Sequence, residues 1–139
     1  MRAAIVYYKD KHEKLLRNLS EALAKGLEEQ GLTVDILDAK TMMSKLAVYK
    51  FIAFGTESTG TFGGKLPEGF TEFLKSSGAM ISTRTFAFVL KKGFNPDKSL
   101  LSLMSVMENE GLFVVSSEVF SKADEAIKAG KAINVKSGL

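Results

Sequence analysis

The order of apolar and amphipathic segments predicts an α/β fold built on a parallel sheet. Short apolar segments with the character of strands alternate with segments of helical period along the whole chain. Nearly continuous apolar runs are typical of strands that helices cover on both faces. We therefore expect a three-layer α/β/α sandwich with a five-stranded parallel sheet and right-handed crossovers.

Size and composition fit one domain over residues 1–139. Of the 139 residues, 45% are hydrophobic and 25% charged, the balance of a globular protein with its own core. No apolar run approaches the ~20 residues that span a bilayer, and the chain opens on a strand-like segment without a signal pattern. We expect a cytoplasmic protein with no membrane partner.

The few residues of catalytic or metal-binding type exclude several kinds of chemistry. There is no Cys and a single His, His12, so neither a disulfide, a thiolate nucleophile nor a metal centre is predicted. The net charge of +3 suits a small anionic ligand. The sequence lacks the dense stripe of Lys and Arg that is typical of a nucleic-acid-binding protein, so we expect no nucleic-acid partner.

Five segments are predicted to be strands because they are short, apolar and bounded by turn residues. They are Arg2–Tyr8, Thr33–Asp38, Phe51–Thr56, Thr85–Leu90 and Leu112–Ser116.

The segments between the strands are predicted to be helices. The first, Lys11–Gln30, has leucines at every fourth position from Leu15 to Leu27 and ends before Gly31. The others are a short helix over Thr41–Val48, Pro67–Ser77, a helix from Asn95 to Gly111, and one that begins at Ser121.

Three helix starts carry capping residues. Asn95 precedes a proline and an acidic residue, the pattern of a helix N-terminus. Ser121 and Asp124 have the spacing of a capping box, and so do Asp10 and Glu13. We expect each of these side chains to accept a hydrogen bond from its own helix.

Ligands of such sheets bind beyond the carboxyl ends of the strands, where the strand order reverses. The predicted loops at that edge are Lys9–His12, Glu57–Lys65, Lys91–Asn95 and Ser117–Phe120.

The chain resembles the flavodoxin-like family over nearly its whole length. The resemblance rests on the first strand with the helix after it, on the segment Gly63–Leu74, and on the strand from Thr85. It implies strand order 2-1-3-4-5, FMN bound between strands one and three, and an electron-transfer function with a protein redox partner. Members that bind FMN wrap its phosphate in a loop rich in Ser, Thr and Gly after the first strand.

That loop here is Lys9-Asp10-Lys11-His12-Glu13, which contains no Gly, Ser or Thr. Glycine eases the tight turn in which successive N–H groups face an anion. The predicted cap also places the Asp10 carboxylate where the phosphate would bind. Lys9, Lys11 and His12, with Lys91 and Lys92 across the edge, are candidates to hold an anion through side chains instead, or they are simply solvated.

The glycine-rich loop after the third strand is the second candidate binding segment. Its hydroxyls and mobile backbone suit a phosphate or a ring edge, and its members are Ser58, Thr59, Gly60, Thr61, Phe62 and Gly63. By the family resemblance, Phe62 would stack on the flavin ring, with Phe94 on the other side. The alternative is that both rings anchor their loops to the core.

Three functions stay open from the sequence. The first is an FMN-binding redox module with a non-standard phosphate site. The second is a flavin-free binding or regulatory module, and the third is an enzyme or binder for another small anion. Glu57 is either a general base in the third of these or an exposed loop carboxylate.

Overall fold

The sheet has five parallel strands. The fold is that of a computed structural model, which describes residues 1–43, 45–59 and 64–136. The order across the sheet is β2-β1-β3-β4-β5, as the family resemblance implied. The strands are β1 (Arg2–Tyr7), β2 (Thr33–Asp38), β3 (Phe51–Glu57), β4 (Arg84–Leu90) and β5 (Phe113–Phe120).

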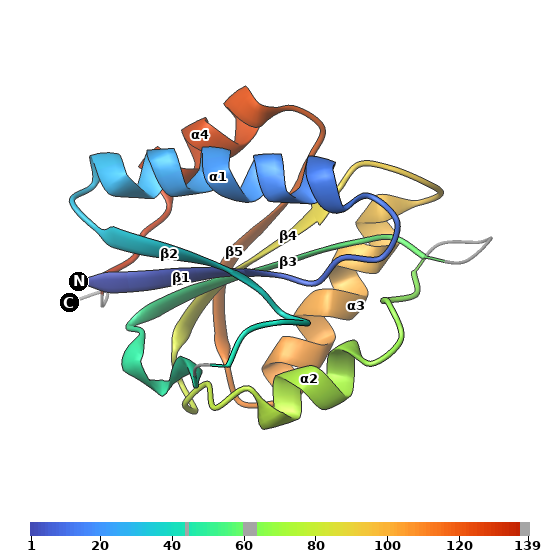
Figure 1. The fold of residues 1–139 in the computed structure, drawn as a ribbon, viewed down its shortest axis with the longest axis horizontal. Coiled ribbons are helices and arrows are strands. Elements are labelled where there is room, and N and C mark those ends of the chain that lie inside the picture. The colour runs from blue at the N-terminus through green and yellow to red at the C-terminus, as the bar shows by residue number, and fades with distance from the viewer. Residues whose placement is uncertain (44, 60–63, 137–139) are drawn as a thin grey trace.

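Helices cover both faces of this sheet, which confirms the three-layer sandwich. In Figure 1, α1 and α4 lie on one face and α2 and α3 on the other. The helices are α1 (Glu13–Glu29), α2 (Phe70–Ser76), α3 (Pro96–Asn109) and α4 (Ala123–Ala132), with a short 3₁₀ turn, η1 (Leu46–Val48).

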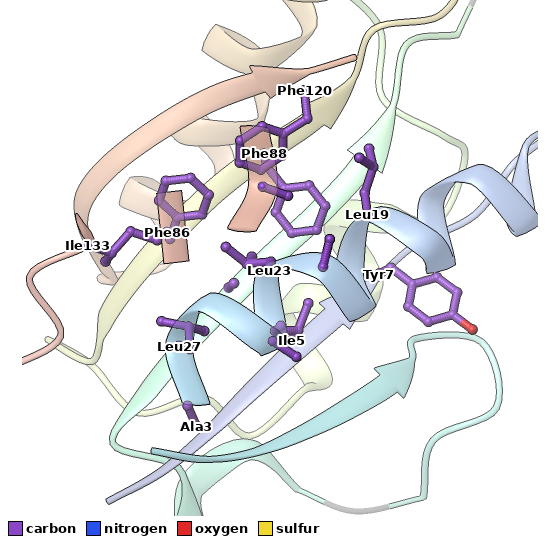
Figure 2. Packing of buried hydrophobic residues seen from close by; sticks show 14 of the residues in the cluster. Ala3, Ile5, Tyr7, Leu19, Leu23, Leu27, Phe86, Phe88, Phe120 and Ile133 are labelled. Atoms are coloured by element: carbon purple, nitrogen blue, oxygen red, sulfur yellow. The ribbon is translucent and has the colours of Figure 1, made fainter. Parts of the chain in front are cut away.

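The core on the α1 and α4 face combines leucines of α1 with aromatic rings from the sheet. Leu23 and Leu27 of α1 lie over Ile5 of β1, and all three side chains are fully buried (Figure 2). The Phe86, Phe88 and Phe120 rings lie 5.7–6.3 Å apart on β4 and β5. Each such buried side chain contributes roughly 1.5–3 kcal/mol.

The two helices on this face cross at a pair of glycines. A Cβ placed on Gly26 of α1 would lie 2.8 Å from the Cα of Gly130 in α4, and the reverse distance is the same. Only glycine allows backbones to approach this closely, so the pair sets the distance between α1 and α4.

The first predicted helix has the right extent but one wrong contact. Leu15 is 43% exposed, whereas Leu16 is fully buried. The buried stripe therefore runs through Leu16, Leu19, Leu23 and Leu27, at the mixed three- and four-residue spacing of a helix. Gly31 ends the helix with φ +92°, as predicted.

Three other predicted bounds are wrong. Helix α2 begins at Phe70 and not at Pro67. Strand β5 continues to Phe120, which pairs with Leu90, so Ser117–Phe120 is strand and not an edge loop. Its polar residues reflect its place at the sheet edge, where one side meets solvent. In the Thr41–Val48 segment, the described part forms only the 3₁₀ turn η1.

No helix in the described parts of the chain combines the length and the apolar character needed to cross a membrane.

Candidate functional site

The strand order reverses between β1 and β3, at the carboxyl edge of the sheet. The two strands run in register up to the pair Tyr7 and Gly55. Beyond it, the Tyr8 N–H donates to the Gly55 carbonyl at 2.8 Å, and the Thr56 hydroxyl donates to the Tyr8 carbonyl at 2.8 Å. These bonds hold the end of β3 against the turn between β1 and α1. Glu57, the last residue of β3, therefore lies beside residues 10–12.

The Glu57 carboxylate is enclosed by that turn. Its Oε2 accepts hydrogen bonds from the backbone N–H groups of Asp10 and His12, each at 3.0 Å. Its Oε1 accepts from the Lys11 N–H at 3.1 Å and lies 2.7 Å from His12 Nδ1. Three successive N–H groups and one imidazole thus converge on a single carboxylate that is 1% exposed.

This arrangement keeps the carboxylate ionised. Burial alone would raise the pKa of Glu57, but the hydrogen bonds from the Asp10 N–H, the His12 ring and the other N–H groups outweigh it and leave the pKa below its usual value. Because an ionised carboxylate only accepts hydrogen bonds, His12 must present a protonated Nδ1 to it. The imidazole and the carboxylate therefore form an ordered pair at the N-terminus of α1.

The predicted cap by Asp10 is wrong. His12 is the N-cap residue of α1 and makes no side-chain cap bond, while Asp10 is exposed. The free N–H groups ahead of the helix are satisfied by Glu57, from a strand 45 residues further along the chain. A carboxylate does fill this position, but it comes from a different residue than the spacing predicted.

The interpretation of Glu57 as an exposed loop carboxylate is also wrong. The strand was expected to end at Thr56, and the structure extends it by one residue into the buried part of the edge. A sequence signal for this buried carboxylate does exist. An acidic residue directly follows an apolar strand, and the loop after the first strand contains no Gly, Ser or Thr. Such a carboxylate needs donors, and that loop offers only its backbone.

The lysines predicted at this edge do not converge on one point. Lys9 Nζ pairs with Asp38 Oδ2 at 3.1 Å, beyond the end of β2. Lys11, Lys91 and Lys92 are exposed, and no ion pair involves them within the described residues.

Both described ends of the glycine-rich loop are held by α3. The Ser99 hydroxyl donates to Ser58 Oγ at 2.9 Å and accepts from the Gly64 N–H at 3.1 Å. Thr59 and Lys65 form an isolated bridge that closes the base of the loop. Gly60, Thr61, Phe62 and Gly63 lie outside the described residues. Ser99 is the residue here that sequence patterns did not reveal, because a buried serine in a helix carries no motif.

Phe94 lies in the turn between β4 and α3. Its side chain is 60% exposed, so it does not anchor that turn to the core. Its carbonyl accepts a hydrogen bond from the Ser58 hydroxyl at 2.9 Å. The turn and the glycine-rich loop are thus joined to each other. Asn95 is the N-cap of α3, and its Oδ1 accepts from the Lys98 N–H at 3.3 Å as predicted.

Comparison with known proteins shows which solved structures share this fold. No family model matches the chain, and no curated protein matches its sequence. Among solved structures, a flavodoxin from the domain Archaea superposes with a TM-score of 0.71 at 17% identity, covering 97% of this chain and 94% of that one. Flavodoxin 1 from Bacillus cereus gives 0.68 at 14% identity, with 93% and 92% covered. A flavodoxin from Streptococcus pneumoniae TIGR4 gives 0.70 at 19%, with 94% and 93% covered.

These similarities confirm the resemblance to the flavodoxin-like family at the level of the fold. The chain is a flavodoxin-like α/β sandwich of nearly the same length as these proteins. At such low identity the similarity concerns architecture, and function has to be argued from the site itself.

Proposed function

We propose that this protein is a flavin-free binding module on the flavodoxin-like fold. One observation supports the proposal: the N–H groups of the turn between β1 and α1 are bonded to the Glu57 carboxylate. A phosphate bound there would have to displace a buried anion from its hydrogen bonds, or share the turn with a like charge. Either alternative disfavours binding, because an ionised acceptor holds its donors more strongly than a neutral one.

The residues of this turn therefore do not fit the FMN phosphate that the family resemblance implies. A built-in carboxylate supplies what the ligand would otherwise contribute: it satisfies the donors ahead of α1 and offsets the positive end of the helix dipole. The turn is thereby ordered without a ligand. A protein so arranged does not depend on FMN for folding, and it acts by binding another molecule.

The direct test is a titration of FMN into the purified protein, followed by quenching of flavin fluorescence. We expect no saturable quenching by the wild-type protein. Saturable binding with a Kd of about 10 μM or tighter would overturn the proposal. Glu57→Gln is the companion variant, because it keeps the shape of the side chain and removes its charge. Circular dichroism of both proteins shows that a negative result does not reflect unfolding.

FMN-dependent electron transfer is the second candidate function. It is favoured by the exposed cations at the edge, Lys11, Lys91 and Lys92, which could hold a phosphate outside the turn. The same titration tests it with the triple variant Lys11→Ala/Lys91→Ala/Lys92→Ala. Wild-type binding that this variant loses would establish the second candidate in place of the first.

A further inference from the structure

The opposite end of the sheet carries an unusual concentration of exposed apolar side chains. Val48, Met80, Ile81 and Phe113 are 59%, 59%, 79% and 53% exposed. They lie at or near the starts of β3, β4 and β5, and we call them the amino-end patch. Beside them is a groove of about 270 Å³. Its lining residues are Ala47, Tyr49, Lys50, Met80, Ile81, Ser82, Thr83 and Arg84.

The turn that presents Met80 and Ile81 is held in place. Ser82 has φ +68°, a left-handed conformation that is uncommon for a residue with a side chain. Its N–H donates to the Gly111 carbonyl at 2.8 Å, and the Thr83 N–H donates to the Met80 carbonyl at 3.1 Å. The backbone of this turn is therefore held so that two consecutive large apolar side chains project outward, mostly exposed to solvent. A backbone that is already ordered reduces the conformational entropy lost on binding.

Two basic residues, Lys50 and Arg84, line the groove beside the patch. Lys50 is exposed and lines the groove, and no ion pair involves Lys50 or Arg84 within the described residues. The Arg84 guanidinium lies 5.3 Å from the centre of the Phe113 ring and has one hydrogen bond, from Nη2 to the Asn134 carbonyl. Arg84 Nε is buried, and no acceptor for it lies within residues 1–43, 45–59 and 64–136. Among the described residues, these two cations therefore have no carboxylate partner.

No acidic residue is among the residues that line the groove. Asp35 is already bonded to Arg2 at 2.8 Å and to the Tyr49 hydroxyl at 2.7 Å. Glu110 precedes Gly111, which lies against the Ile81 side chain, so this carboxylate borders the Ile81 end of the patch and does not line the groove. The unpaired positive charge is thus on the β3 and β4 side, beside the groove.

We propose that the amino-end patch binds an acidic protein segment with large apolar side chains. Apolar side chains of the partner would cover Met80 and Ile81, and its carboxylates would pair with Lys50 and Arg84. A second copy of this chain fits less well, because a two-fold contact places the same patch on both sides and brings like charges together. The inference rests on the proposed function in that it names the binding surface of the module.

The test uses three labelled synthetic peptides and fluorescence anisotropy. The first is an amphipathic peptide with Leu and Phe on one face and Glu on the other. The second has every Glu replaced by Lys, and the third has every Leu and Phe replaced by Ser. We expect the first peptide to bind at least about tenfold more tightly than the other two. No binding by the first peptide, or equal binding by all three, would overturn the proposal.

Variants of the protein locate the binding surface. Ile81→Asp and Lys50→Glu should each weaken binding of the first peptide about tenfold or more. Leu101→Asp is the matched control, because Leu101 is 67% exposed on α3 and lies outside the patch. Peptide binding that Leu101→Asp weakens while Ile81→Asp does not would place the surface elsewhere and refute the assignment.

The oligomeric state tests the remaining alternative, in which a second copy of this chain covers the patch. Sedimentation should show a monomer, and a dimer that Ile81→Asp dissociates would identify the patch as a contact between copies and overturn the proposal.

FMN quenching reports on the other end of the sheet, so a failed flavin-free proposal and a failed patch proposal give different results. Glu57→Gln should leave peptide binding unchanged.

Discussion

The N-termini of α1 and α4 are both capped by a glutamate, and they differ in where that glutamate comes from. At α4, Glu125 lies in the first turn of the helix itself, and its Oε1 accepts from the Ser121 N–H at 2.7 Å and the Lys122 N–H at 3.2 Å. At α1, Glu57 comes from the end of β3. Glu125 stabilises its own helix, whereas Glu57 joins a helix, a turn and the central part of the sheet.

The two caps also differ in burial. Glu57 is enclosed, and the N–H groups of Asp10, Lys11 and His12 all donate to its carboxylate. The Glu125 bonds are exposed, so water can replace the carboxylate at little cost. The same hydrogen bonds at two helix ends therefore contribute unequally to the free energy of unfolding. Burial decides how much of that free energy is lost when the acceptor is removed.

Removal of the Glu57 side chain should have the largest effect on stability. Glu57→Ala leaves three N–H donors and the His12 ring without their acceptor, so we expect the free energy of unfolding to fall by about 2–4 kcal/mol. Urea unfolding followed by circular dichroism measures it. A loss below about 1 kcal/mol would mean that water replaces the carboxylate, and the distinction between the two caps would disappear.

Acid should remove part of the same stabilisation. The folded-state pKa of Glu57 is lowered, so its contribution is fully present above the unfolded-state value of about 4.3 and is lost as pH falls through the folded-state pKa. Unfolding of the wild type should therefore become easier below about pH 4. Glu57→Gln should be less stable at neutral pH and should lose less on acidification. Equal acid sensitivity in both proteins would assign the effect to other carboxylates.

Removal of the α4 cap should have the smallest effect. The pKa of Glu125 is lowered by the N–H and hydroxyl of Ser121 and by the Lys122 N–H, but these bonds are exposed. Glu125→Gln should lower the melting temperature less than Glu57→Gln does. Thermal unfolding of the two variants side by side tests the order, and a reversed order would contradict the role given to burial.

Sequence patterns could predict the architecture because they reflect local rules. Apolar runs mark strands, leucine spacing marks the buried face of α1, and the Asn95 cap and Gly31 stop follow from backbone geometry alone. The predicted capping box of α4 is wrong in its residues: Lys122 and not Ser121 is the N-cap, the acceptor is Glu125 and not Asp124, and the Ser121 hydroxyl donates to Glu125 Oε1 instead of accepting from the helix. These features lie within a few residues of one another in the chain.

The candidate site could be predicted only in its position. The sequence placed it at the carboxyl edge, and the resemblance placed it between strands one and three, where Glu57 and His12 lie. The partnership itself could not be predicted. Asp10 has suitable spacing to cap α1, and nothing local distinguishes it from a carboxylate that arrives from another strand.

The sequence by itself determined the alternation of strands and helices, the ends of most elements and the edge at which a ligand would bind. Tertiary structure alone decided that the turn after β1 closes around Glu57 and that Met80 and Ile81 face solvent beside Lys50. The physical reason is that hydrogen bonding and burial depend on distance in space. Periodicity and capping depend on separation along the chain, and the amino-acid sequence specifies this separation directly.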